Sequence, residues 1–170
     1  DSLFHNKLYA DPCTDLILFD YFDSFNENNR ALITSLSSTK YLTSKNLSDY
    51  LKGYAIQPNR KRLFNSCWGK IFNVKILKTN PKVRFNNKLH IYEDLDFVLR
   101  FLRKCKTVYY VKEPAYVYNI PTLYGPATNS TFGFNWSSYQ LFSFFYFLRQ
   151  LYFLLIEFKV NSNDARRLLY

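Results

Sequence analysis

The residues best suited to chemistry lie in one short acidic segment, Tyr92-Glu93-Asp94-Leu95-Asp96. Its first acid, Glu93, directly follows 43 residues, 50–92, that contain ten Lys or Arg and no Asp or Glu. A carboxylate in basic surroundings stays ionised and can act as a general base, taking a proton from a hydroxyl as its oxygen attacks. The same side chains at the start of a helix can instead cap free N–H groups and interact with the helix dipole. For Asp94 and Asp96 both interpretations stay open at this point.

A second candidate segment is Asn65-Ser-Cys-Trp-Gly-Lys70. Gly69 permits a close backbone approach, Trp68 offers a flat face for a sugar ring, and Lys70 offers a cation for a phosphate. The alternative is a buried Trp and a surface Lys at a tight bend. Cys67 has no His or Asn partner at a recognisable spacing, so we do not expect a thiol nucleophile.

A third segment, 139–158, is almost entirely aromatic and aliphatic. Ser143, Gln150 and Glu157 repeat every seven residues and form one narrow polar stripe on a helix. Arg149 in the middle argues against a helix that simply spans a membrane. We therefore expect a core helix, a dimer helix, or a helix that lies in a membrane interface.

The charge of the chain is concentrated in its middle. Residues 40–112 carry seventeen Lys or Arg and four Asp or Glu, within a total net charge of +10. This pattern favours a polyanionic partner, namely a nucleic acid, a phosphate-bearing small molecule or an anionic membrane, or else indicates a solvated basic face. No zinc-finger, Walker or RNP motif favours nucleic acid, and neither His5 nor His90 has a partner at metal-ligand spacing.

The composition excludes several classes of protein. The 170 residues are 48% hydrophobic with four Gly and six Pro, which excludes a disordered or collagen-like chain. Three cysteines without a CxxC spacing exclude a disulfide framework and a zinc ribbon, and favour a reducing compartment. The chain has no Met and begins at Asp1, from which we expect a piece of a longer protein.

Apolar periodicity predicts alternating strands and helices, and hence an α/β layer fold. Leu95, Val98, Leu99 and Leu102 fall on one face and predict an amphipathic helix over 95–105. The region 67–77 is ambiguous, and a helix over 43–53 would be capped by Thr43 or Ser44 and stopped by Gly53. The other predicted strands are a buried parallel strand at 15–22 and strands at 107–111 and 115–118, separated at Pro114. Loops are predicted at 24–40 and 119–135, and further helices at 136–158 and 161–170.

The order of these pieces resembles a known family. The segments DLILFDYF, NSCWGKIFNVKIL, VRFNNKLHIYEDLDFVLRFL and VYYVKEPAYVYNI, over roughly residues 10–131, look like the second half of a bacterial family 2 glycosyltransferase. The group that it resembles builds surface polysaccharide and lipooligosaccharide. Its W-G-K, E-D and E-P-x-Y-x-Y elements occur here in the same order. One departure is Asn119, where many relatives have Arg, followed by a longer loop.

The resemblance implies a partial GT-A fold, a three-layer α/β sandwich without its N-terminal strands. Residues 1–135 would form the acceptor side of the catalytic domain, and 136–170 would be C-terminal helices. Asp94, with Glu93 beside it, would activate the acceptor, and Trp68, Gly69 and Lys70 would lie near the sugar and diphosphate. A divalent metal, Mg or Mn, would be bound mostly by residues that this chain lacks.

The function so implied is that of an inverting hexosyltransferase. It would move a sugar from a nucleotide-diphosphate donor to a hydroxyl of a glycan or lipid-linked acceptor, and this piece alone would be inactive. We expect a cytoplasmic protein, peripheral on the inner face of the cell membrane or forming a homodimer. Two alternatives stay open, a non-catalytic binding or scaffold module of the same fold and a basic nucleic-acid-binding domain.

Overall fold

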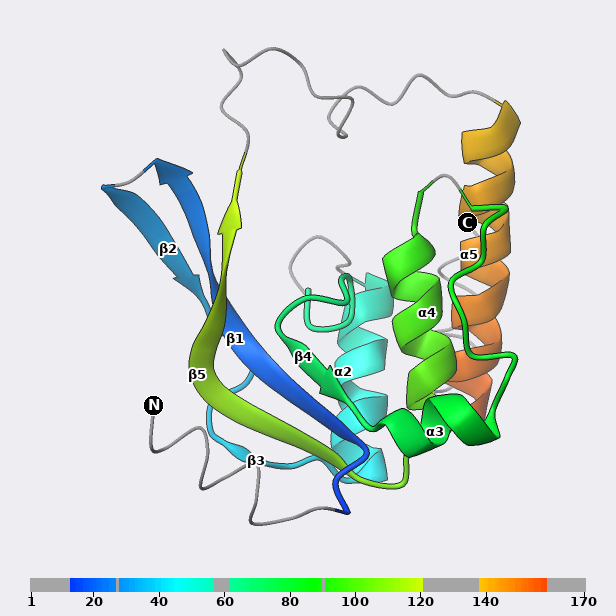
Figure 1. The fold of residues 1–170 in the computed structure, drawn as a ribbon, viewed down its shortest axis with the longest axis horizontal. Helices are drawn as coiled ribbons and strands as arrows, with labels where there is room; N and C mark the ends of the chain where they lie inside the picture. The colour runs from blue at the N-terminus through cyan, green and yellow to red at the C-terminus, as the bar shows by residue number, and fades with distance from the viewer. Residues whose placement is uncertain (1–12, 27, 57–61, 90, 121–137, 159–170) are drawn as a thin grey trace.

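The computed structural model describes residues 13–26, 28–56, 62–89, 91–120 and 138–158 (Figure 1). These residues form a mixed α/β structure, as the periodicity predicted. Its elements are β1 (Leu16–Asn26), β2 (Asn29–Ile33), β3 (Lys40–Tyr41), α2 (Ser44–Ile56), β4 (Lys70–Phe72), α3 (Val74–Thr79), α4 (Glu93–Leu102), β5 (Val108–Asn119) and α5 (Ser138–Glu157).

Strand β1 is the centre of a curled, mixed sheet of order β2-β1-β5-β3. It runs parallel to β5 from the pair Leu16 and Val108 to the pair Ser24 and Asn119. On its other edge β1 pairs antiparallel first with β4 and then with β2. The carboxyl ends of β1 and β5 therefore lie side by side, and this is where open α/β sheets commonly bind ligands.

The four helices of the described residues lie on one side of this sheet (Figure 1). Helices α2 and α4 pack on the strands, and α5 packs against α2 and α4 from the far side. The core holds the predicted stripe of α4, since Leu95, Val98, Leu99 and Leu102 are at most 3% exposed. A three-layer sandwich needs helices on both faces of the sheet. Because the described helices lie on one face, the three-layer sandwich stays a prediction.

Pro114 interrupts the ladder of β5 without ending the strand. We expected two strands separated at this proline, but β5 is continuous from Val108 to Asn119. The register with β1 shifts instead, so that Phe19 pairs with Val111 while Asp20 pairs with Pro114. A proline cannot donate to the ladder, and a bulge accommodates it at little cost to the pairing on either side.

Two other predictions were wrong at their boundaries. Thr43 does cap α2, because its Oγ1 accepts from the Asn46 N–H at 3.2 Å, but α2 continues past Gly53 to Ile56. Tyr54 is 5% exposed, so burying this ring favours another turn of helix over a glycine stop. The predicted loop at 24–40 contains the end of β1 and all of β2.

Strand β2 was not predicted because its side chains do not alternate between buried and exposed positions. Four of its five residues are exposed, so the sequence carries no period-two apolar signal there. The ambiguous region 67–77 resolves into β4 and α3. The predicted helix at 161–170, most of the 119–135 loop, His5 and His90 lie outside the described residues.

Candidate functional site

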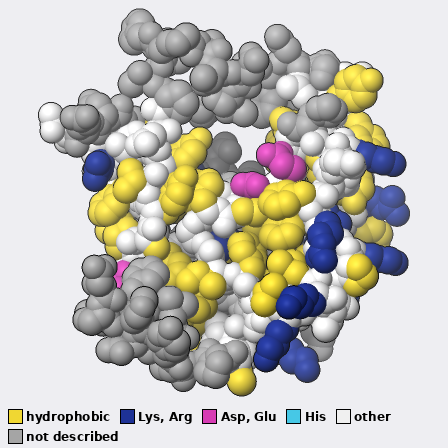
Figure 2. All heavy atoms as spheres, viewed as in Figure 1, with side chains coloured by type: hydrophobic (Ala, Val, Ile, Leu, Met, Phe, Trp, Pro, Cys, Tyr) yellow, Lys and Arg dark blue, Asp and Glu magenta, His cyan; other side chains and the backbone are white. Residues whose placement is uncertain are grey.

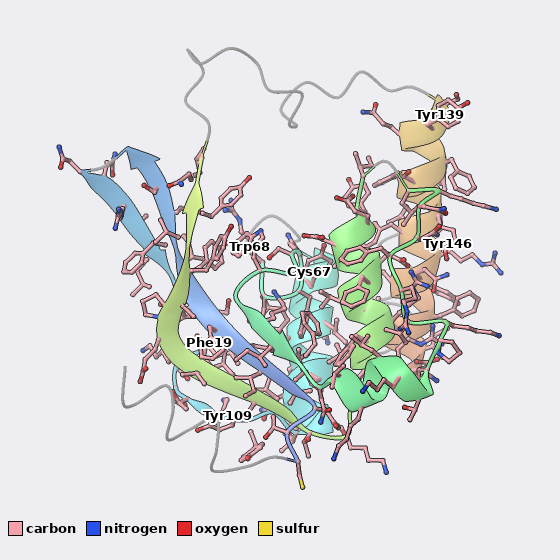
Figure 3. All side chains as sticks on the ribbon, in the orientation of Figure 1. Phe19, Cys67, Trp68, Tyr109, Tyr139 and Tyr146 are labelled. Atoms are coloured by element: carbon pink, nitrogen blue, oxygen red, sulfur yellow. The ribbon has the colours of Figure 1, made fainter. Side chains whose placement is uncertain are left out.

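Trp68 lies in an aromatic cluster beside the carboxyl ends of β1 and β5 (Figure 3). Its ring stacks on Tyr116 with centroids 4.8 Å apart and on Tyr118 with centroids 5.2 Å apart. Tyr21 of β1 meets the Trp68 ring edge-on at 4.6 Å. Since Tyr21 pairs with Tyr116 in the sheet, the two strands and the segment before β4 together build this cluster.

Asp94 links the acidic segment to the Trp68 segment. Its carboxylate Oδ2 accepts from the backbone N–H of Cys67 at 3.1 Å, across 27 residues of sequence. The Cys67 thiol in turn donates to the backbone carbonyl of Asp94 at 3.7 Å. The Asp94 carboxylate therefore accepts its hydrogen bond from the backbone of Cys67, the residue before Trp68, and not from an N–H in the first turn of α4.

Tyr92, the residue before the acidic pair, has a left-handed backbone with φ of 64°. A side chain with a Cβ is strained there by roughly 1–2 kcal/mol. Its ring stacks on Phe147 of α5 at 4.9 Å, and its carbonyl accepts from the Asp96 N–H at 2.9 Å. Helix α5 thus holds the turn that aims Glu93 and Asp94.

Lys70 begins β4 next to these groups. Its Nζ donates to the Trp68 carbonyl at 3.4 Å. Burial lowers the pKa of Lys70 from 10.5 to about 8, opposed by the nearby Cys67 and Asp94 side chains. Burial also raises the pKa of the Cys67 thiol to about 12, with Asp94 adding to the rise, so this thiol stays protonated as expected for a non-nucleophile.

Gly69 has a left-handed backbone with φ of +64°, a conformation that favours glycine. A Cβ at this position would meet no described protein atom nearer than 3.9 Å. In this conformation the Gly69 carbonyl accepts from the Phe19 N–H at 3.0 Å, which anchors the Trp68 segment to β1. The close approach of Gly69 to a ligand stays a prediction.

The other two carboxylates of the acidic segment differ sharply in environment. Glu93 is exposed, whereas Asp96 is fully buried and accepts from Arg100 one turn later on α4. Burial raises the pKa of Asp96, and the Arg100 charge and hydrogen bond counteract that rise. Arg100 also donates to the carbonyls of Lys82 and Arg84. Asp96 therefore helps to fasten the preceding segment to α4.

The sequence reasoning missed Asp23 and Arg62. Asp23 is 4% exposed, and its Oδ2 accepts from Arg62 Nη1 at 3.1 Å. Asp23 pairs with Tyr118 in the sheet, so this ion pair borders the aromatic cluster. Burial raises the pKa of the neighbouring Tyr21, while a hydrogen bond with Arg62 lowers it. The available signal was two acids, Asp20 and Asp23, three residues apart in a mainly apolar strand.

Figure 2 shows the molecular surface hollowed between the sheet and the start of α4. Hydrophobic side chains line the sheet side of this hollow, and acidic side chains stand on the opposite rim. In the first turn of α4 the acidic residues are Glu93, Asp94 and the buried Asp96. An aromatic wall facing a carboxylate suits a ligand that has both an apolar face and hydroxyl groups.

Within the described ranges, no group of three or more His, Cys, Asp or Glu side chains could hold a metal ion. In the same ranges no helix is long and apolar enough to cross a membrane. No family model, no curated protein and no solved structure matches this chain.

Proposed function

We propose that this chain is the acceptor side of an inverting glycosyltransferase, which moves a sugar from a nucleotide-diphosphate donor to a hydroxyl of a growing glycan. One observation carries the proposal. The three short motifs of the family resemblance lie together at the carboxyl ends of β1 and β5. They are W-G-K with Trp68, E-D with Asp94, and E-P-x-Y-x-Y with Tyr116 and Tyr118. Residues with purely local structural roles would not need to meet at one place.

Asp94 is the proposed general base. Because its Oδ2 is held by the Cys67 N–H, Oδ1 can accept the proton of an acceptor hydroxyl. The acceptor oxygen then attacks C1 of the donor sugar and forms the new C–O bond. The bond from C1 to the diphosphate oxygen breaks, and the nucleoside diphosphate leaves with the electron pair. Attack from the face opposite the leaving group inverts C1.

The neighbouring residues would bind and orient the substrates. Tyr116 is 40% exposed, so it and the half-buried Trp68 offer a rigid aromatic surface against which a sugar ring can pack. Lys70, with a pKa of about 8, is mostly protonated at neutral pH and can attract the diphosphate. Glu93 stands exposed beside Asp94, on the proposed acceptor side.

The divalent cation implied by the resemblance has no place among the described residues. They contain no suitable cluster of ligands, so no step of this proposal passes through a metal. We expect Mg or Mn, in the complete enzyme, to be held by residues other than those described.

The decisive variant is Asp94→Asn in the complete enzyme. Asparagine keeps an oxygen that can accept from the Cys67 N–H, so the fold should survive while the base is lost. We expect kcat for sugar transfer to fall by at least ~10², with donor affinity little changed. Asp49→Asn, at an exposed position of α2, is the matched control and should leave kcat unaltered.

Near-normal turnover of the Asp94→Asn enzyme would contradict this role. A complete protein that binds nucleoside diphosphates but transfers no sugar, with wild-type Asp94, would instead favour the non-catalytic module. Steeply salt-dependent binding of DNA or RNA, without affinity for nucleoside diphosphates, would favour the nucleic-acid-binding alternative.

A further inference from the structure

Helix α5 buries the first residue of its polar stripe, Ser143, while Gln150 is half-buried and Glu157 is exposed. Ser143 is 0% exposed and donates to the Tyr139 carbonyl at 2.9 Å. Glu157, two heptads later on the same stripe, forms an ion pair with Arg103, the C-cap residue of α4. The apolar residues buried on this side are Phe147, Leu151, Leu154 and Leu155. The inner face of α5 therefore contains Ser143 of the polar stripe together with the apolar residues next to it.

The opposite side of α5 is apolar and exposed. We call it the outer face of α5; its hydrophobic members and their exposed fractions are Leu141 (39%), Phe142 (51%), Phe145 (64%), Phe153 (42%) and Ile156 (47%). Steps of three or four residues place most of these side chains on one stripe of the helix. A contiguous apolar stripe of this kind marks an interaction surface on a protein in water.

Positive charge accompanies this outer face. Arg149 is exposed among its hydrophobic residues, with the guanidinium 5.7 Å from the centroid of the Phe153 ring. The segment 80–92 runs beside α5 in Figure 1, is tied to it by the stacking of Tyr92 on Phe147, and contains no acid. Figure 2 shows Lys and Arg side chains mixed with hydrophobic ones along this edge of the molecule.

The exposed cations of the 80–92 segment are Lys82, Arg84 and Lys88. The one acid within α5, Glu157, is paired with Arg103. An apolar stripe flanked by cations, with its acid already neutralised, is complementary to an anionic bilayer, which takes up the aromatic rings and attracts the cations to its headgroups.

We propose that the outer face of α5 lies in the surface of an anionic membrane and attaches the protein there peripherally. The phenylalanine rings would enter the boundary between headgroups and acyl chains, and Arg149 would extend to the lipid phosphates. A second copy of the chain fits less well, because antiparallel pairing of two outer faces brings two Arg149 cations together. No described carboxylate on that face would neutralise them.

Flotation of the 170-residue chain with lipid vesicles tests the proposal. We expect binding to vesicles of phosphatidylcholine mixed equally with phosphatidylglycerol, little binding to phosphatidylcholine alone, and a loss of binding as salt rises. The double variant Phe145→Ser/Phe153→Ser should weaken binding at least about tenfold, since each ring loses its burial in the bilayer. Arg149→Gln should weaken it about fivefold, and on the anionic vesicles alone.

The matched control is Leu32→Ser, because Leu32 is 51% exposed on β2, away from α5. It should leave vesicle binding unchanged, and circular dichroism should show that all variants stay folded. Absence of binding to the anionic vesicles at low salt would overturn the proposal, and so would equal binding by the double variant. A concentration-dependent dimer in sedimentation velocity that Phe145→Ser/Phe153→Ser abolishes would make the outer face a self-association surface instead.

Discussion

Helices α4 and α5 pack against each other but use their polar residues in opposite ways. Helix α4 buries the apolar stripe that its sequence predicts and presents Glu93 and Arg103 to solvent. Helix α5 buries Ser143 of its polar stripe and leaves Phe142 and Phe145 exposed. The difference teaches that a narrow polar stripe does not identify the solvent side of a helix when apolar residues cover nearly all of its surface.

The two helices also divide the work of building the candidate site. The first turn of α4 carries Asp94, and the inner face of α5 stabilises that turn through the stacking of Phe147 on Tyr92. The inner face thus supports the candidate site, while the outer face is exposed. Five predictions test this division and the role of Lys70 in the candidate site, from the largest expected effect to the smallest.

Phe147→Ala should destabilise the protein far more than Phe145→Ala. Phe147 is 5% exposed and packs in the core, so its truncation should cost about 3–5 kcal/mol of unfolding free energy. Phe145 is 64% exposed, so its truncation should change that free energy by no more than about 0.5 kcal/mol. Urea unfolding of both variants provides the measurement, and similar losses would mean that the inner and outer faces are wrongly assigned.

Arg100→Met tests the environment of Asp96, the one polar residue that α4 buries. Without Arg100, Asp96 has no counterion among the described residues, and the variant should lose about 3 kcal/mol at neutral pH. Burial raises the pKa of Asp96 and Arg100 lowers it, so removal of Arg100 raises it further. Between the ordinary pKa of an aspartate and this higher value, folding takes up a proton, so stability should fall as pH rises across that window.

The loss in Arg100→Met should accordingly be smaller at pH 4 than at pH 7, as measured by urea unfolding at both values. Arg100→Met/Asp96→Asn is the control, because an amide does not titrate and its pH dependence should be flatter. A loss of equal size at both pH values would show that Arg100 acts through its hydrogen bonds to the 80–92 segment alone.

Lys70 should make the stability of the protein vary with pH in the alkaline range. Its pKa is about 8 in the folded protein against 10.5 ordinarily, so between these values the unfolded chain binds more protons. Stability should therefore rise with pH across this window, and Lys70→Met should remove the rise. The control is Lys52→Met, at an exposed position of α2, which should leave the pH dependence of the wild-type chain intact.

The same titration should appear in ligand binding. If Lys70 contacts the diphosphate, the affinity of the complete enzyme for nucleoside diphosphate should drop roughly tenfold between pH 7 and pH 9.5, the size of one charged hydrogen bond. Lys70→Arg keeps its charge in this range and should flatten the dependence. Calorimetric titration measures it, and an unchanged profile would remove Lys70 from the donor site.

Arg103→Ala should have the smallest effect, although its ion pair with Glu157 links the two helices directly. Both side chains are partly exposed, so the pair should contribute between about 0 and 1 kcal/mol of stability. Thermal unfolding at low and high salt would check this. A loss several times larger would mean that the ion pair, rather than apolar packing, holds α5 on α4.

Much of the fold followed from the sequence because local patterns determine it. The stripe of Leu95 and Val98 predicted α4, the apolar run from Asp15 predicted β1 as a parallel strand, and Thr43 capped α2 as expected. The predictions that failed were those in which a distant contact overrides a local signal. Tyr54 reaches the core and extends α2 past Gly53, and pairing with β1 carries β5 through Pro114.

The sequence by itself determined the residue types of the candidate site, because the acidic cluster, the Trp68–Lys70 segment and the basic middle of the chain can all be read without coordinates. Only the tertiary structure decided that Asp94 meets the Cys67 N–H, that Tyr116 stacks on Trp68, and which side of α5 faces outward. The physical reason is that these contacts join residues far apart in sequence. Their geometry depends on strand register, on the backbone turns at Gly69 and Tyr92, and on the competition among apolar faces for one core.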